Sequence, residues 1–263
     1  MRRTLALVAV AVAAGVCVGV LGALPASAAK PPNVSGAITV SAAASLAPAF
    51  TKMGADFQQR NAHTTIRFNF AASSALVAQI QGGAPADVFA SADRATMAAL
   101  VSGGQVTAHP VNFAANLLTI VVKPGNPEKV TSLANLRSVG IVSLCAATVP
   151  CGKYAAQVLS RNHVSISTDK ITLGQDASAT LAAVASGDAD AGIVYVTDAK
   201  RAGTTVQTVK IPASRNVLAV YPIAGLAPSQ NRALANAWVR YVTSRAGQRT
   251  LRSFGFLPVP TAA

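Results

Sequence analysis

The chain has 263 residues, of which 51% are hydrophobic, and it carries a formal net charge of +13. This length allows one large domain or two of medium size. The basic residues are scattered rather than clustered, and aromatic residues make up only 5%, so the sequence offers no evident stacking platform for nucleic acid. We therefore predict no nucleic-acid partner, whereas the charge is compatible with long-range attraction of a small anion.

Residues 1–28 have the pattern of an export signal. Arg2 and Arg3 form a charged start, residues 5–24 are apolar, and Ala26-Ser27-Ala28 offers a small-residue cleavage site. An apolar stretch of about 20 residues can also be a single membrane anchor, but the cleavage site favours a signal peptide. The mature chain would carry a net charge of +11 and would lie in the periplasm or cell envelope, either free or attached to the membrane surface.

Residues 38–46 (ITVSAAASL) predict a short strand that runs through three alanines into a helix. Ile38 and Val40 are β-prone, and the apolar residues from 46 to 57 recur at helical spacing. Ser45 falls at the junction, where we expect an N-cap. The unpaired backbone N–H groups at such a junction, with the helix dipole behind them, make a potential anion site.

The next unit repeats this arrangement. Residues 64–70 alternate as a strand and lead through Ala71-Ala72-Ser73-Ser74 into a helix that Gly82-Gly83 ends. In successive β-α units of a parallel sheet, both helix N-termini meet at the carboxyl edge of the strands, where open α/β sheets bind ligands. We interpret Asp87 and Asp93, which follow, as a turn residue and an N-cap rather than as a pair for acid–base catalysis.

A continuous apolar strand at residues 117–122 is expected to cross into a second lobe, where residues 140–144 form the next strand. Cys145 and Cys151 are the only cysteines after the export signal, and their spacing in an exported chain favours one disulfide over two free thiols. A helix is predicted to begin at about Gly152. Its first turn offers the free N–H groups of Cys151 and Gly152.

The second lobe contains two further strand–helix junctions. Asp176 is expected to cap a helix, which leaves the N–H of Ala177 exposed in the first turn. Residues 191–196 predict a buried strand, after which Thr197-Asp198 is expected to cap the next helix. The phenol of Tyr195 either donates to a ligand or belongs to a half-buried core aromatic, and the sequence leaves both interpretations open.

Residues 216–223 predict a strand that returns to the first lobe, followed by helices at 230–243 and 244–256. Trp238 lies on the apolar stripe of the first helix, so we expect it to pack in the core rather than to recognise a ligand. No G-x-S-x-G nucleophile motif is present, and the three histidines lie in polar or loop-like surroundings. We therefore predict that the chain is not an enzyme.

Five stretches taken together resemble the molybdate-binding proteins of bacterial ABC transporters. They are ITVSAAASL (38–46), FAASSALVAQI (70–80), GAPADVFASAD (83–93), VPCGKY (149–154) and GIVYVTD (192–198). The resemblance spans nearly the whole mature chain and implies an α/β, type II periplasmic binding protein fold, with two α/β lobes joined by two crossover strands. We expect lobe I to comprise residues 29–115 and 219–263, and lobe II residues 116–218.

The resemblance also implies a set of ligand-binding residues. They are Ser45 and Ser73 (with Ser74 as the register alternative), the backbone N–H groups of Cys151 and Ala177, and Tyr195. Cys151 and Ala177 depart from the family in side chain but keep the N–H that matters. None of the five is charged, so hydroxyls and N–H dipoles would neutralise a dianion, and a protonated oxyanion would lack the acceptor that its O–H needs.

The resemblance implies an extracytoplasmic solute-binding protein that captures molybdate or tungstate between its lobes and delivers it to an ABC permease. It would need no cofactor and no metal cation, since molybdenum enters only as the bound oxyanion, and we expect a monomer. Two alternatives of the same fold stay open. One is a sulfate- or phosphate-binding protein, and the other is a ferric-iron-binding protein, which would need clustered tyrosines with a histidine or carboxylate.

Overall fold

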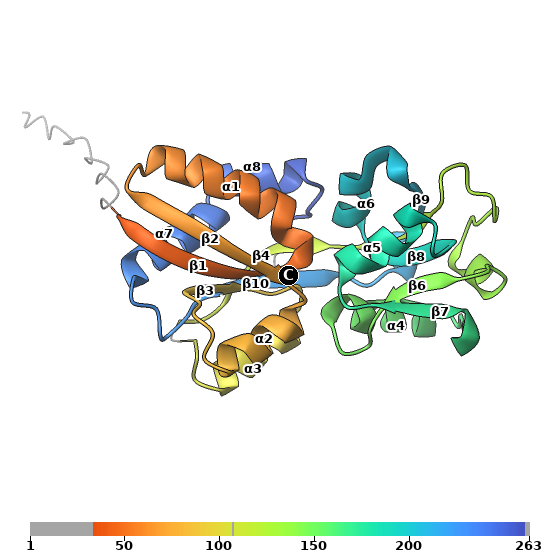
Figure 1. Cartoon of the computed structure of the whole chain (residues 1–263), viewed down its shortest axis with the longest axis horizontal. Coiled ribbons are helices and arrows are strands. Elements are labelled where there is room, and N and C mark those ends of the chain that lie inside the picture. The colour runs from red at the N-terminus through yellow and green to blue at the C-terminus, as the bar shows by residue number, and fades with distance from the viewer. Residues whose placement is uncertain (1–33, 107, 261–263) are drawn as a thin grey trace, which may run out of the picture. The chain divides into compact units, whose positions relative to one another are not determined.

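The computed structural model describes residues 34–106 and 108–260, and the predicted export signal lies outside them. The described residues form two five-stranded sheets with helices packed against them (Figure 1). No helix within these ranges is both long and apolar enough to cross a membrane.

The first sheet has the strand order β2-β1-β3-β10-β4. Its strands are β1 (Gly36–Ala43), β2 (Thr64–Ala71), β3 (Val88–Ala90), β4 (Val111–Asn116) and β10 (Ala219–Gly225). β1 pairs in parallel with β2 and β3, while β10 is antiparallel to β3 and β4. The predicted returning strand is therefore confirmed. β4 has no clear pattern in the sequence, because its exposed first residues, Val111 and Asn112, interrupt the apolar signal, and the sequence predicts no strand there.

The second sheet has the order β7-β6-β8-β5-β9. Its strands are β5 (Leu118–Val122), β6 (Val142–Cys145), β7 (Ile171–Gly174), β8 (Ala191–Tyr195) and β9 (Gln207–Lys210). β6 is parallel to β7 and β8, whereas β5 is antiparallel to β8 and β9. We call the first sheet with its helices lobe I and the second sheet with its helices lobe II.

Helices cover both faces of each sheet. Lobe I contains α1 (Ala47–Arg60), α2 (Ser73–Gln81), α3 (Arg94–Ser102), α7 (Arg232–Thr243) and α8 (Arg245–Ser253), and lobe II contains α4 (Pro150–Arg161), α5 (Ala177–Ser186) and α6 (Val196–Ala202). Val88 and Ala90 of β3 pack in the core beneath α1 and α7, while Phe89 between them packs beneath α2 and α3. Because successive side chains of a strand point to opposite faces, a strand buried on both faces must be apolar throughout.

The core of lobe I is built around Trp238. Its side chain is fully buried, and its ring meets those of Phe50, Phe57 and Phe68 edge-on at centroid distances of 5.6, 5.7 and 5.7 Å. This edge-to-face packing is favourable for aromatic rings. The predicted packing role of Trp238 is confirmed.

Two chain segments pass between the sheets: Leu117, which joins β4 to β5, and residues 211–218, which join β9 to β10. Asn216 links them, because its Oδ1 accepts from the backbone N–H of Leu118 at 3.2 Å and its Nδ2 donates to the carbonyl of Leu118 at 2.8 Å. The two crossovers are therefore bound to each other where the chain passes between the lobes.

Candidate functional site

A cavity of about 20 Å³ lies among the strand–helix junctions of both lobes. It is lined by Ala43, Ala44, Ser45, Ala71, Ala72, Ser73, Ala92, Val149, Pro150, Cys151, Asp176, Ala177 and Tyr195. The five residues expected to hold the ligand all line it. Of the two register alternatives, Ser73 lines the cavity and Ser74 does not. A single water molecule needs roughly 10–15 Å³, so the cavity suits only a small occupant.

The junctions that form this cavity bring four helical N-terminal turns together. They are the 3-10 turn Ala44–Leu46 that leads into α1, and the first turns of α2, α4 and α5. The first N–H groups of a helix have no intrahelical acceptor, and the helix dipole favours negative charge there. α4 begins two residues earlier than predicted because Pro150 occupies its first turn, where a missing N–H costs nothing. The whole arrangement suits an anion.

The serine hydroxyls at two of these junctions each have a hydrogen-bond partner within the protein. The Oγ of Ser73 accepts from the backbone N–H of Ala92 at 3.0 Å, which leaves its own proton free to be donated. The Oγ of Ser45 lies 3.0 Å from the phenol oxygen of Tyr221. The expected N-cap role of Ser45 is wrong, because the chain enters a 3-10 turn before α1 and Ala43 takes the N-cap position.

Tyr195 stands at the end of β8 and is 2% exposed. Its phenol oxygen has no hydrogen-bond partner within the described residues, yet the residue lines the cavity. Burial raises the pKa of this phenol well above its ordinary value, so it remains a neutral donor. An unpaired buried hydroxyl is costly, and a ligand that accepts a hydrogen bond would remove that cost.

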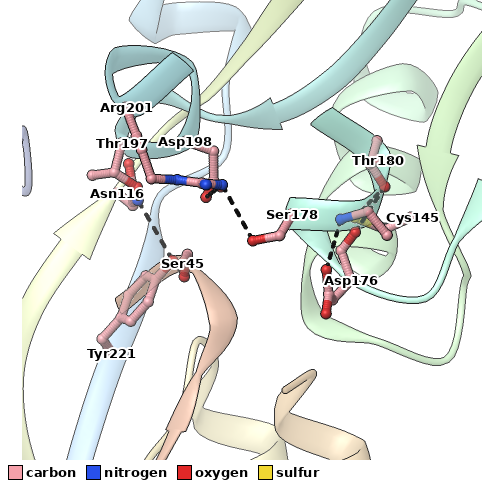
Figure 2. Close-up of polar contacts among 11 residues, drawn as sticks. Ser45, Asn116, Cys145, Asp176, Ser178, Thr180, Thr197, Asp198, Arg201 and Tyr221 are labelled. Atoms are coloured by element: carbon pink, nitrogen blue, oxygen red, sulfur yellow. Dashed lines mark hydrogen bonds and ion pairs between the residues drawn. The ribbon is translucent and has the colours of Figure 1, made fainter. Parts of the chain in front are cut away.

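The predicted disulfide is confirmed: Cys145 and Cys151 are bonded, with Cα atoms 5.8 Å apart. The bond joins the end of β6 to the first turn of α4. The sulfur of Cys145 also accepts a buried hydrogen bond from the hydroxyl of Thr180 in α5 (Figure 2). One wall of the cavity is therefore cross-linked covalently and tied to a neighbouring helix.

Among the described residues, Asp176 is the only charged one that lines the cavity. Its Oδ1 accepts from the N–H of Ala179 at 2.8 Å, so the predicted N-cap is confirmed (Figure 2). Within residues 34–106 and 108–260, no lysine or arginine lines the cavity. An anion bound there would be neutralised by hydroxyl and N–H dipoles rather than by an ion pair.

The structure adds residues that the sequence analysis did not assign to the site. Tyr221, Asn116 and Thr197 form a buried polar network with Ser45 (Figure 2). The rings of Tyr195 and Tyr221 also meet at a centroid distance of 5.9 Å. Tyr221 was seen only as part of a returning strand, because no local pattern shows that β10 passes behind Ser45.

Thr197 and Asp198 were expected to cap the next helix, and that prediction is wrong. α6 already begins at Val196 with Tyr195 as its N-cap, so Asp198 falls inside the first turn. Its side chain is 1% exposed, and neither carboxylate oxygen has a hydrogen-bond partner among the described residues. Arg201 pairs with it at 3.8 Å. Burial raises the pKa of Asp198 to about 7, although the charge of Arg201 opposes the rise.

Two α/β lobes, two crossovers and a small donor-lined cavity at the carboxyl ends of parallel strands define a solute-binding protein of the type II periplasmic binding fold. Residues 38–257 match the family described as bacterial extracellular solute-binding protein. The chain belongs to this family. Its relatives are binding proteins of transport systems rather than enzymes, which confirms the prediction that it is not an enzyme.

The comparisons with individual proteins agree with this assignment. The molybdate-binding protein ModA of Mycobacterium tuberculosis is 40% identical over 231 residues, which cover 88% of each chain. The periplasmic molybdate-binding protein of Azotobacter vinelandii and the sulfate-binding protein SubI of M. tuberculosis both superpose with a TM-score of 0.75 at 20% identity. Each match covers 85% of this chain, and 100% and 87% of those two chains, respectively. Because these two structures are named for different anions and match equally well, they show the fold alone.

Proposed function

We propose that this chain is an exported, monomeric protein that binds molybdate, or tungstate, in the cavity and delivers it to an ABC permease. The 40% identical relative named for molybdate supports this substrate. The observation that carries the proposal is that the hydroxyl-bearing residues Ser45, Ser73 and Tyr195 and several helix N-termini meet at one cavity. In the part of the chain that the structure describes, no cationic side chain lines that cavity. We propose that residues 29–115 with 219–263 and residues 116–218 act as the two lobes that close on the anion.

The donor set favours a fully deprotonated oxyanion. The hydroxyl of Ser73 already accepts from Ala92, and the phenol of Tyr195 stays protonated, so both present protons to the ligand. An oxyanion that itself carries a proton would turn an O–H, rather than an accepting oxygen, toward one of these donors and would lose that hydrogen bond. Hydrogen phosphate is disfavoured on this ground. Sulfate presents the same chemistry as molybdate, so size must separate the two.

A ferric-iron site would need anionic oxygen ligands, typically clustered tyrosinates. All four tyrosines of the chain lie in the described residues, and only Tyr195 lines the cavity. The phenol oxygen of its neighbour Tyr221 is occupied by Ser45 and Asn116. Burial raises the pKa of both phenols, which keeps them neutral. This arrangement favours an anion over a cation.

Thermal unfolding of the mature protein with saturating molybdate, tungstate, sulfate or phosphate, at matched ionic strength, tests the proposal. A ligand that binds only the native state raises the unfolding midpoint. We expect a clear rise with molybdate and tungstate alone. A rise with sulfate instead would keep the anion cavity but replace the substrate, and no rise with any of the four would refute the proposal.

Substitution of either cavity serine is expected to weaken molybdate binding. Ser45→Ala and Ser73→Ala each remove one donor to a buried anion, which costs roughly 1–3 kcal/mol of binding free energy. Calorimetric titration measures the change. Ser143→Ala is the matched control, because Ser143 is also buried and does not line the cavity, and its hydroxyl has no hydrogen-bond partner in the described part of the chain. Wild-type affinity in both cavity variants would contradict the site assignment.

A further inference from the structure

The hydroxyl of Ser45 can donate to an anion only if its proton points into the cavity. Its Oγ also lies 3.0 Å from the phenol oxygen of Tyr221, and either oxygen could be the donor in that hydrogen bond. The direction of this one hydrogen bond therefore decides whether Ser45 offers a proton or a lone pair to the ligand. The surrounding residues fix that direction.

Asn116 sits behind Tyr221 at the end of β4 and is completely buried. Its Oδ1 accepts from the backbone N–H of Leu117 at 3.0 Å, so the other end of the amide must be the nitrogen. That Nδ2 donates to the hydroxyl of Thr197 at 2.8 Å and points its second proton at the phenol oxygen of Tyr221 at 3.5 Å (Figure 2). An amide nitrogen donates but does not accept, so this end of the network can only supply protons.

The phenol oxygen of Tyr221 thus faces a donor on one side and Ser45 on the other. If Ser45 also donated to it, the phenol proton would be left without an acceptor, since the described residues place no third hydrogen-bonding group on this oxygen. Tyr221 is fully buried, and an unpaired buried O–H is costly. The phenol therefore donates to the Oγ of Ser45, and the proton of Ser45 is left for the cavity.

We propose that Asn116 and Tyr221 form a one-way chain of hydrogen-bond donors that ends on Ser45 and holds the hydroxyl proton of Ser45 toward the bound oxyanion. Tyr221 is then a positioning residue that also sets specificity, because a serine held as a donor cannot turn to accept from a protonated oxyanion. Burial raises the pKa of the Tyr221 phenol well above its ordinary value, so the chain keeps its direction at neutral pH.

Ser73 offers an internal comparison. Its hydroxyl is held in the same sense by the backbone N–H of Ala92, a donor that no side-chain substitution removes. At Ser45 the corresponding donor is a side chain 176 positions away in sequence, so it can be deleted without touching the cavity. The inference rests on the proposed function, because it requires an oxyanion in the cavity.

The test is calorimetric titration of wild type, Tyr221→Phe, Ser45→Ala and the double variant with molybdate and with hydrogen arsenate at about pH 8. We expect Tyr221→Phe to weaken molybdate binding about three- to tenfold and to narrow the preference for molybdate over hydrogen arsenate. In the Ser45→Ala background the same substitution should have no further effect, because Tyr221 acts through Ser45. Tyr241→Phe removes a phenol from α7 that does not line the cavity, and this variant should behave like wild type.

Additive effects of Tyr221→Phe and Ser45→Ala, or an unchanged preference between the two anions, would overturn the proposal. If Tyr221→Phe does not fold, Asn116→Ala removes the donor at the start of the chain. Asn116→Ala should weaken molybdate binding in the wild-type background but not in the Ser45→Ala background. If the effects of the two substitutions on molybdate affinity add, the proposal is overturned. A wild-type protein that binds neither anion would instead refute the proposed function, so the two failures are distinguishable.

Discussion

Gly152→Ala is expected to lower the free energy of unfolding by about 1–3 kcal/mol and to weaken oxyanion binding by more than tenfold. A Cβ at position 152 would lie 2.0 Å from the carbonyl oxygen of Ala146 and 2.7 Å from that of Cys145. Both are backbone atoms, so the clash cannot be relieved by turning a side chain. The first turn of α4 and the end of β6 would have to separate.

The disulfide between Cys145 and Cys151 opposes that separation, because it ties the same two segments together six positions apart. The strain therefore falls on the first turn of α4, where Cys151 lines the cavity. An N–H displaced from a buried anion loses most of its hydrogen bond, since the bond weakens steeply with distance and angle.

Denaturant unfolding and calorimetric titration of the variant measure the two effects separately. Gly225→Ala is the matched control, because a Cβ there would meet only the side-chain oxygen of Asn236, at 3.5 Å, and Gly225 does not line the cavity. A folded Gly152→Ala variant that binds molybdate as tightly as wild type would show that the first turn of α4 does not hold the anion.

Much of the fold could be predicted because its signals are local. The strand–helix junctions at Ser45 and Ser73 follow from runs of small residues between a β-prone and a helical pattern, and Asp93 and Asp176 cap helices as their spacing indicates. The disulfide follows from two cysteines in a chain whose start has the pattern of an export signal. Each of these features depends on residues only a few positions apart.

The features that the sequence did not show depend on contacts between distant segments. Tyr221 stands 176 positions from Ser45, and Asn116 stands 81 from Thr197, so no periodicity brings these residues together. The sequence predicts Asp198 as a helix cap, because aspartate is common at helix N-caps. The chain instead begins α6 directly after β8, which moves this carboxylate into the interior.

Asp198→Asn is expected to stabilise the protein above neutral pH. Burial raises the pKa of Asp198 from 3.8 to about 7, with Arg201 opposing the rise and the negative charge of Asp176 adding to it. The native state therefore binds the proton more tightly than the unfolded chain does. The resulting contribution to stability is fully present below about pH 4 and is lost as the pH rises through about 7. The shift in pKa from 3.8 to about 7 corresponds to a loss of at most about 4 kcal/mol in the free energy of unfolding.

Wild type should therefore lose stability between about pH 4 and pH 7, while Asp198→Asn, which carries no charge to bury, should lose much less. Thermal unfolding at a series of pH values measures this, and Asp188→Asn, which removes an exposed carboxylate, is the control. Equal pH dependence in wild type and Asp198→Asn would show that Asp198 is ionised at little cost.

The charge of Asp198 also acts on the phenol of Tyr195, which lines the cavity. The same ionisation should therefore oppose a bound dianion, so that molybdate affinity falls as the pH rises through 7 in wild type and falls less in Asp198→Asn.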